Sequence, residues 1–408
     1  MVKNITLCVI ATLTLNGFSQ ISEKQIKKDI TFLASDKLKG RGTSTNEEKL
    51  AANYIAKQFK TCGLMPKGND NYLYHFTFKK NSNPHDTSIV NIPERNGINV
   101  IGFLDNKAEN TIVIGAHYDH LGLGHDHNSL DANPENKIHN GADDNASGTS
   151  GVLELARYFS NNTVKENYNF LFICFSGEEL GLLGSKKWCD NPSINLSSIN
   201  YMINMDMIGR LNDSTKRLLI YGVGTSPTWV PLLDKTNTYF SIKKDSSGIG
   251  PSDQTSFYLK DIPVLHFFTG QHSDYHKPSD DVDKINISGE KKVLDYIVEL
   301  INATNSLPRL VFTKTSAPVS TSTKWKVTMG VMPDYAFEGE GMRIDGVSDN
   351  KPGFKAGVKT GDVVIKLGEL NVKNVQDYMK ALSVFKKGDK TIVVVKRGNE
   401  NLSLELEF

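Results

Sequence analysis

The sequence predicts an α/β fold, a three-layer sandwich in which helices cover both faces of a mostly parallel mixed central sheet. Short, apolar and often β-branched runs, typical of buried strands, lie at 111–116, 170–175, 201–205 and 262–268. Helical patterns fall between or after these runs, at 147–159, 181–188, 227–238 and 287–304. Strands that alternate with helices favour a parallel sheet with helices on both faces.

The segment before these strands is predicted to be mostly helical. Residues 23–33 and 46–62 have apolar side chains at helical spacing, with a loop at 34–42 between them. A further strand is expected at 72–79. The small polar residues and the proline at 313–323 have no periodicity, so they indicate a linker. We therefore expect one large domain at 20–308, a linker at 309–325 and a small domain at 326–408.

Residues 1–19 resemble a secretory signal peptide. Lys3 is basic, the apolar run from Ile5 to Leu15 is too short to span a bilayer, and small residues follow it. We therefore expect cleavage near residue 19 and a secreted or periplasmic location. Cleavage would leave Cys62, Cys174 and Cys189, an odd number that excludes a full disulfide framework and allows at most one bridge. The net charge of +1 gives no indication of nucleic acid, and no later stretch predicts a membrane span.

Residues of metal-ligand type follow the predicted strands. His117 and Asp119 follow the first strand, Glu178 and Glu179 the second, and Asp206 the third, while His276 lies after the last. Open α/β sheets place their sites at the carboxyl ends of the strands, so these side chains are expected to converge. In the stretch GADDNASG, small residues surround Asp143 and Asp144 at the start of a helix. Two histidines, three ligand carboxylates and one spare carboxylate suit two zinc ions with an open position for water.

The motifs HYDH, NGADDNASG, SGEELGLLGS, NMDMIGR and DYHKPSDD, in this order, resemble peptidase family 28, the co-catalytic zinc aminopeptidases. The resemblance extends from about residue 26 to residue 301. It implies a zinc-aminopeptidase-like sandwich and hydrolysis of N-terminal residues from peptides. It also implies that His117, Asp143 and Asp206 bind one zinc and that Asp143, Glu179 and His276 bind the other, with Asp143 shared. In this family the peptide bond that here joins Asp143 and Asp144 is often cis.

The resemblance also implies roles for three further residues. Glu178 is expected to be the general base and acid, and Asp119 to orient His117 through its second ring nitrogen. Tyr275 matches a tyrosine that hydrogen-bonds the substrate carbonyl oxygen in some relatives. Packing is the alternative role for this side chain.

The small domain resembles bacterial PDZ domains. Residues 328–332 have the apolar-Gly-apolar form of a carboxylate-binding loop, and 353–365 resemble the PDZ domains linked to proteases. A helix is expected at 374–385 and a strand at 391–396. PDZ domains add an extended peptide as an extra strand, so this domain is expected to tether a substrate or a partner. The alternative is a stabilising appendage.

Three other functions fit parts of the sequence. Glutaminyl cyclases use a related scaffold with one zinc. A carboxypeptidase would require arginines at the substrate pocket, for which Arg41 and Arg210 are the nearest candidates. A catalytically inactive protein that acts through its PDZ domain would not need Glu178. The complete set of acids and histidines favours the aminopeptidase.

Overall fold

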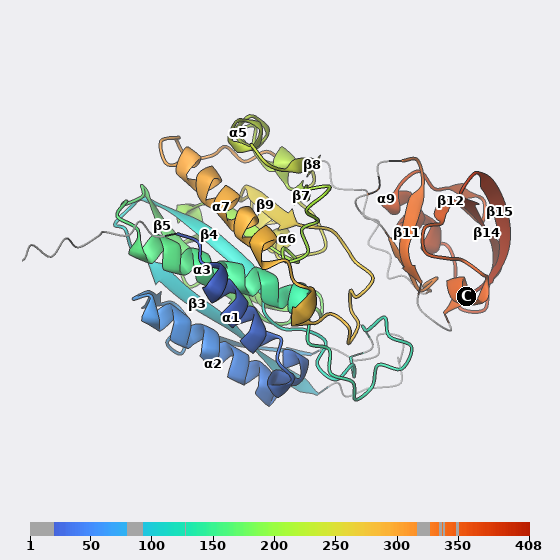
Figure 1. Cartoon of the computed structure of the whole chain (residues 1–408), viewed down its shortest axis with the longest axis horizontal. Coiled ribbons are helices and arrows are strands. Elements are labelled where there is room, and N and C mark those ends of the chain that lie inside the picture. The colour runs from blue at the N-terminus through green and yellow to red at the C-terminus, as the bar shows by residue number, and fades with distance from the viewer. Residues whose placement is uncertain are drawn as a thin grey trace, which may run out of the picture.

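The computed structural model describes residues 20–79, 93–126, 128–315, 327–333, 337, 339–347 and 351–408. Their strands form two sheets, one of nine strands and one of six (Figure 1). The predicted signal peptide at 1–19 lies outside the described residues.

The large sheet has a parallel centre with antiparallel strands on either side. Its strands are β1 (Met65–Pro66), β2 (Leu73–Lys79), β3 (Glu94–Leu104), β4 (Asn110–His117), β5 (Tyr168–Phe175), β6 (Ile199–Met205), β7 (Arg217–Tyr221), β8 (Ser241–Asp245) and β9 (Val264–Phe268). Strands β5, β4, β6 and β9 are neighbours in that order and run parallel. Strands β3 and β7 pair with the two ends of this group in the antiparallel sense. The predicted mixed, mostly parallel central sheet is confirmed.

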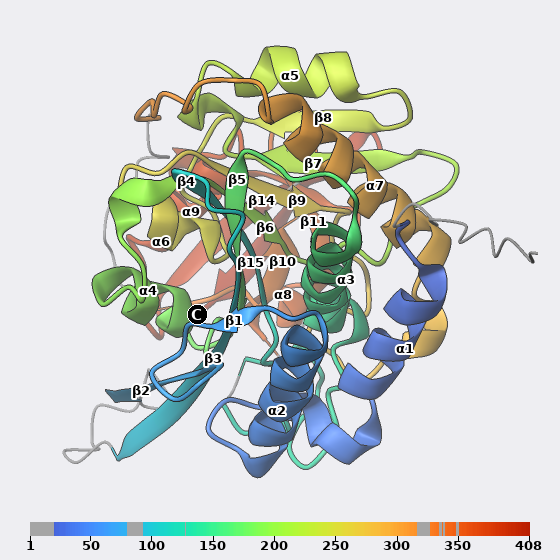
Figure 2. The ribbon, with the colours of Figure 1, turned by 90° about the vertical axis from the view of Figure 1, so that its left-hand side faces the viewer.

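Helices cover both faces of this sheet (Figure 2). One face carries α1 (Glu23–Leu33), α2 (Asn46–Thr61), α3 (Gly148–Asn161), α5 (Trp229–Thr236) and α7 (Ile287–Thr304). The other carries α4 (Leu183–Asp190) and α6 (Gln254–Tyr258). Short helical turns complete the large domain: η1 (Asp36–Arg41), η2 (Ala142–Ser147), η3 (Leu196–Ser198), η4 (Val223–Thr225) and η5 (Val282–Lys284).

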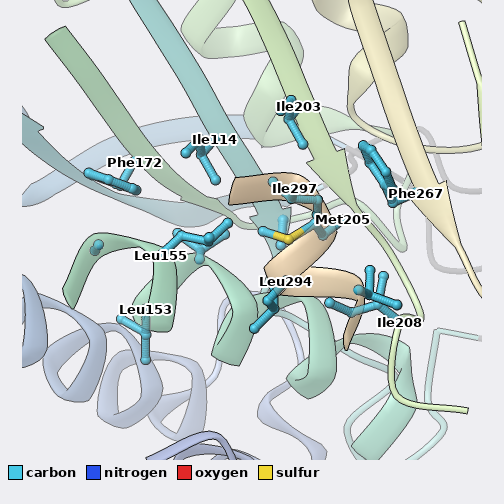
Figure 3. Close-up of a cluster of buried hydrophobic side chains, with 14 of the residues drawn as sticks. Ile114, Leu153, Leu155, Phe172, Ile203, Met205, Ile208, Phe267, Leu294 and Ile297 are labelled. Atoms are coloured by element: carbon cyan, nitrogen blue, oxygen red, sulfur yellow. The ribbon is translucent and has the colours of Figure 1, made fainter. Parts of the chain in front are cut away.

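The alternation of side chains along the strands produces two separate cores. Ile112 and Ile114 pack on one face of the sheet and Val113 on the other, because successive side chains of a strand point to opposite sides. Figure 3 shows the larger core, where Ile114, Ile203 and Phe267 of the sheet face Leu155 of α3 and Ile297 of α7. Burial of these side chains fixes the strand ends that carry the polar residues discussed below.

The C-terminal part is a small antiparallel sheet with two helices. Its strands are β10 (Val331–Pro333), β11 (Met342–Val347), β12 (Val363–Leu367), β13 (Leu370–Asn371), β14 (Lys390–Arg397) and β15 (Glu400–Glu407). Its helices are α8 (Pro352–Lys355) and α9 (Val375–Leu382). The strand order is β10-β11-β12-β14-β15, so β10 lies at an edge. Met329, Val364 and Val393 belong to its own buried core.

Residues 309–315, at the start of the predicted linker, lie against the large domain. Leu310 belongs to the large core, and the Arg309 guanidinium donates to the main-chain oxygens of Ser197 and Ile199. The rest of the linker prediction, 316–325, lies outside the described residues. Cys62, Cys174 and Cys189 are all free, and no helix among the described residues is long and apolar enough to cross a bilayer.

Candidate metal centre and catalytic cavity

Side chains from several strand ends meet at one edge of the large sheet. His117 is the last residue of β4, Asp206 follows β6, and Glu178 and Glu179 follow β5. Asp144 lies in η2, between β4 and α3, and His276 lies in the loop after β9. The parallel strands thus bring residues of metal-ligand type together at their carboxyl ends, as the sequence predicts.

The first group of possible metal ligands consists of His117, Asp144 and Asp206. The Nε2 atom of His117 is 3.3 Å from Oδ1 of Asp144 and 3.3 Å from Oδ1 of Asp206. The His117 and Asp144 side chains are buried, with 1% and 4% of their surface exposed. One imidazole nitrogen and two carboxylate oxygens at this spacing suit a single cation of the zinc type.

The second group of possible metal ligands consists of His120, Asp144 and Glu179, and His276 lies against the same Asp144 oxygen. Oδ2 of Asp144 is 3.2 Å from Nε2 of His276, which lies 3.1 Å from Oε2 of Glu179. On the other side of Glu179, Oε1 is 2.8 Å from Nδ1 of His120. The Asp144 carboxylate therefore faces both groups, as a bridging ligand between two metal ions would.

The prediction that Asp143 is the shared ligand is corrected to Asp144. Oδ1 of Asp143 accepts hydrogen bonds from the main-chain nitrogen of Gly209 at 2.7 Å and from Oγ of Ser147 at 3.0 Å. Its Oδ2 lies 3.1 Å from Nε2 of His272. Both of its oxygens are thus engaged away from the ligand groups. The cis peptide bond is likewise Asp144–Asn145 rather than Asp143–Asp144.

Two glycines allow the turn that carries Asp144. Gly141 has a φ of +56°, and a Cβ atom there would lie 2.5 Å from Cγ of His120. A Cβ atom on Gly148 would lie 2.3 Å from the main-chain oxygen of Met205. No side chain fits at either position, because the contacting atoms belong to backbone or to a buried ring. The small residues around the aspartate pair thus have the shaping role that the sequence predicts.

The Arg41 guanidinium supports the same turn. It donates to the main-chain oxygens of Tyr118 at 2.5 Å, Leu33 at 3.1 Å and Gly141 at 2.7 Å, and also to that of Asn140. The side chain is fully buried, and burial lowers its pKa to about 10. Arg41 is therefore a structural cation and does not face the substrate pocket.

Asp119 contacts His117 through its backbone rather than its carboxylate. The Nδ1 atom of His117 is 3.1 Å from the main-chain oxygen of Asp119 and 3.8 Å from its Oδ1. The carboxylate instead accepts a hydrogen bond of 3.2 Å from the main-chain nitrogen of Glu178 and one of 2.8 Å from Oγ1 of Thr43. Asp119 thus connects His117 with Glu178 and fixes the backbone that carries the predicted base.

The two adjacent glutamates have opposite electrostatic environments. Burial raises the pKa of Glu178 well above its usual range, and the carboxylates of Asp206 and Glu179 add to this increase. Burial also acts to raise the pKa of Glu179, but His276 and His120 lower it to about 2. Glu178 is thus the more basic of the two carboxylates and Glu179 the one that stays ionised, the division that a base and a metal ligand require.

A cavity of about 240 Å³ opens beside the two ligand groups. Its polar wall contains His117, Asp144, Glu178, Asp206 and His276. The rest of the lining is mostly apolar or aromatic: Leu130, Met207, Tyr221, Pro251, His266, Phe268, Gln271, Tyr275, Val331 and Pro333. Tyr275 lies in this wall and its ring stacks on His276 with centroids 3.9 Å apart. Its contact with a substrate carbonyl stays a prediction.

Two histidines of the site are not among the predicted residues. His120 contacts Glu179, and its Nε2 atom is buried without a partner. His266 lines the cavity from β9, and burial lowers its pKa to about 4, so the ring is neutral. His120 could have been found from the sequence, because it lies close to His117 in the motif HYDH. His266 lies inside an apolar strand, and the sequence gives no comparable indication of its place at the site.

Protein-family models match both parts of the chain. The sequence model of Peptidase family M28 matches residues 99–301, and that of the PDZ domain matches residues 318–408. Aminopeptidase YwaD of Bacillus subtilis (strain 168) is 30% identical over 192 residues, which are 44% of this chain and 38% of that protein. The alignment therefore spans less than half of this relative.

Solved structures share the fold of the large domain. BSAP, a zinc aminopeptidase from Bacillus subtilis, has a TM-score of 0.57 at 16% identity, over 73% of this chain and 97% of BSAP. Porphyromonas gingivalis glutaminyl cyclase has a TM-score of 0.56 at 16% identity, over 70% of this chain and 99% of the cyclase. Peptidases and cyclases thus share this fold, so the fold alone does not decide between the two activities for this chain. The residues of the site have to decide between them.

Proposed function

We propose that this chain, which carries a peptidase domain of family M28 followed by a PDZ domain, is a zinc aminopeptidase that removes N-terminal residues from peptides. The proposal depends on one observation. Two groups of possible metal ligands share the carboxylate of Asp144, and the first of them lines one cavity with Glu178, a glutamate of raised pKa.

The donors fit two zinc ions. His117, Asp144 and Asp206 would hold one ion, and Asp144 and Glu179 would hold the other together with a histidine. His276, which the family resemblance implies, and His120, which the structure groups with these two acids, both contact Glu179. Imidazole nitrogens and carboxylate oxygens are the usual ligands of catalytic zinc. When bound, the pair of ions would lower the pKa of a water molecule and stabilise the oxyanion that forms at the scissile carbonyl.

The protein's own residues supply the proton transfers and the substrate orientation. Glu178 accepts the proton of the attacking water and later donates it to the leaving amine. Asp119 holds the main-chain nitrogen of Glu178, which keeps this glutamate at the cavity wall. Tyr275, also in the cavity wall, would donate a hydrogen bond from its hydroxyl group to the substrate carbonyl oxygen.

The charge of the cavity favours a free N-terminus over a free C-terminus as the group bound next to the metals. Glu178 and Asp206 attract the positive α-amino group of a peptide. Among the described residues, no arginine or lysine lines this cavity. Arg41 is occupied by main-chain oxygens, and Arg210, which donates to Oδ2 of Asp274 at 3.2 Å, does not line the cavity, so neither carboxypeptidase candidate faces a substrate there.

Replacement of Glu178 by glutamine tests the proposal. A glutamine side chain cannot accept the proton, so we expect kcat for aminoacyl amides to fall by a factor of about 10²–10⁴, while two zinc ions per chain remain bound. Turnover of leucinamide and metal content by mass spectrometry are the measurements. Glu94→Gln, an exposed change on β3, is the control.

Two comparisons separate the alternatives. A substrate with a blocked amine should not be cleaved, and a peptide with an N-terminal glutamine should not yield pyroglutamate. One zinc per chain together with cyclisation would favour the glutaminyl cyclase. Retention of most activity in the Glu178→Gln variant would remove the assigned base.

The proposal includes export, with residues 1–19 as a cleaved signal peptide. Expression in a bacterial host and mass measurement of the chain from the periplasm or medium tests this. A mature chain that begins near residue 20 is the expected result, and a full-length chain in the cytoplasm would contradict it.

A further inference from the structure

The catalytic cavity contains a buried polar side chain that the proposed mechanism does not use. His266 of β9 lies in the cavity wall with only 2% of its surface exposed. Neither of its ring nitrogens has a hydrogen-bond partner among the described residues. A buried polar group without a partner is costly to a protein, so such a group in the wall of a binding cavity indicates a hydrogen bond to a ligand.

Neighbouring rings hold His266 in place. The ring of Tyr221 on β7 stacks on it with centroids 5.4 Å apart, and the ring of Phe268 on its own strand lies at 6.1 Å. His266 and Tyr221 are also direct partners in the antiparallel pairing of β9 with β7. All three rings line the cavity. Packing against aromatic neighbours, rather than a hydrogen bond, thus fixes the orientation of the imidazole.

His266 is uncharged, which limits the groups that it can bind. Burial lowers its pKa to about 4, although the carboxylate of Asp206 acts in the opposite direction. A neutral imidazole has one nitrogen that donates a hydrogen bond and one that accepts. It therefore suits a hydroxyl or an amide group, whereas a carboxylate would gain no ion pair from it.

A second atom without a partner lies in the same wall. Oε1 of Gln271, in the loop after β9, is buried and accepts no hydrogen bond from any residue that the structure describes. The acids of the wall are already assigned, Glu178 to proton transfer and Asp144 and Asp206 to the metals. In the described part of the chain, the lining contains no lysine, no arginine and no further acid. The polar groups left for a substrate side chain are thus uncharged.

The same side chain also meets an apolar surface. Met207 and Phe268 belong to a small hydrophobic cluster that is separate from the two large cores, and Tyr221 and Tyr275 pack against it. All four of these residues line the cavity. A side chain that enters beside them gains from apolar surface along its length and from a neutral polar group at its end.

We infer that the cavity selects peptides whose N-terminal side chain is large and ends in an uncharged hydrogen-bonding group, as in tyrosine or glutamine, and that His266 and Gln271 bind this group. The inference rests on the proposed aminopeptidase function and names its substrate class. The α-amino group lies among the acids, and the side chain packs on Met207 and Phe268. N-terminal phenylalanine or methionine would leave His266 and Gln271 unpaired, so the site disfavours both.

Tyrosinamide and phenylalaninamide differ by one hydroxyl group and provide the first test. On the zinc-loaded full chain, we expect kcat/KM for tyrosinamide to exceed that for phenylalaninamide by about tenfold or more. The dipeptide Gln-Ala should likewise be cleaved faster than Met-Ala, with free glutamine as the product. The inference is overturned if, in both pairs, the polar substrate is hydrolysed no better than the apolar one.

The second test replaces the two residues. His266→Phe keeps the aromatic packing and removes both ring nitrogens, so the ratio of kcat/KM for tyrosinamide to that for phenylalaninamide should fall towards one. His75→Phe makes the same change at an exposed position of β2 and should leave the ratio unaltered. Gln271→Met, at a partly exposed position, should also lower the ratio. An unaltered ratio in His266→Phe, or in Gln271→Met where His266→Phe does not fold, would contradict the inference.

Binding without turnover separates this inference from the proposed function. We expect the amino alcohol tyrosinol to bind the zinc-loaded chain about tenfold or more tightly than phenylalaninol, as measured by isothermal titration calorimetry. Equal affinities would count against the selected side chain. If tyrosinol binds more tightly but neither leucinamide nor tyrosinamide is hydrolysed, the proposed function fails and the side-chain site remains.

Discussion

Asp143 and Asp144 are adjacent in the chain, both buried and chemically identical, yet they have different functions. Asp144 directs one oxygen to each group of metal donors. Asp143 turns into the protein and accepts hydrogen bonds from Gly209 and Ser147. The difference comes from the local backbone, because Asp144 and Asn145 leave the helical φ/ψ region inside η2.

Asparagine at each position should separate these functions. Asp144→Asn removes a bridging charge, so we expect both zinc ions to be lost or weakly held and kcat to fall by a factor of about 10³ or more. Asp143→Asn can keep an oxygen against Gly209 and Ser147, but it replaces the oxygen beside Nε2 of His272 with an uncharged NH2 group, which should lower the free energy of unfolding by about 1–3 kcal/mol. Metal content and thermal unfolding of both variants are the measurements. Full zinc retention in Asp144→Asn would contradict the assignment.

The residue types of the site could be predicted from the sequence better than their directions. His117, Glu178, Glu179, Asp206 and His276 all reach the cavity or its donor groups, because strand ends fix where they lie. Which of two neighbouring aspartates faces the metals depends on φ/ψ values within a turn. No pattern of residue types encodes those values, so the predicted shared ligand is one position too early.

At the scale of elements, helices with clear caps are predicted most accurately. Helices α1 and α7 begin after Ser22 and Asn286, whose side chains accept hydrogen bonds from the first turn, and both match their predicted bounds. Strand β3 is not among the predicted elements, although it has 11 residues. It contains Gly97 and Gly102, which weaken a strand signal, and the rings of Phe76 and Phe59 occupy the space that Cβ atoms would need.

Glu48 makes the packing of α2 against the sheet sensitive to pH. Its carboxyl group accepts hydrogen bonds from Oγ of Ser176 and from the main-chain nitrogen of Ser44, and burial raises its pKa to about 8. The folded state therefore holds a proton that the unfolded state releases above about pH 4.5. The contribution of Glu48 to the free energy of unfolding is therefore fully present below about pH 4.5, and it is lost as the pH rises towards 8.

The free energy of unfolding of the variant Glu48→Gln should depend less on pH than that of the unaltered protein. Between about pH 4.5 and pH 8, the Glu48 contribution should decrease by about 1.4 kcal/mol per pH unit in the unaltered protein. Glutamine does not titrate, so the variant should lose this slope and gain stability relative to the parent at higher pH. Urea unfolding at a series of pH values measures how the free energy of unfolding depends on pH. Glu47→Gln, on the same helix, is the control. Parallel pH profiles of parent and Glu48→Gln would contradict the assignment.

At the scale of the whole molecule, the proposed metal centre would link catalysis to stability. Asp144, Glu179 and Asp206 converge in a buried region where their charges repel one another unless cations are present. Ligand groups come from β4, η2 and the loops after β5, β6 and β9, so bound ions would connect most of the large sheet.

Removal of metal by a chelator should therefore lower the Tm of the large domain, and zinc should restore it. At a free zinc concentration about 100 times the Kd, one site contributes about 2.7 kcal/mol to the free energy of unfolding. Differential scanning calorimetry with and without chelator measures the shift, and the transition of the small domain, which contains none of the donors, is an internal control. An unchanged Tm for the large domain would exclude tightly bound metal.

The fully buried guanidinium of Arg41 has a consequence for the lifetime of the active enzyme. It attaches the first helices of the chain to the main-chain oxygens of Tyr118 and Gly141, beside the residues proposed to carry zinc. A protease that removes the chain past this arginine would release the turn and so stop the proposed activity, without altering any of the proposed zinc ligands. Degradation that begins at the amino terminus would therefore abolish turnover first, before the rest of the chain is digested.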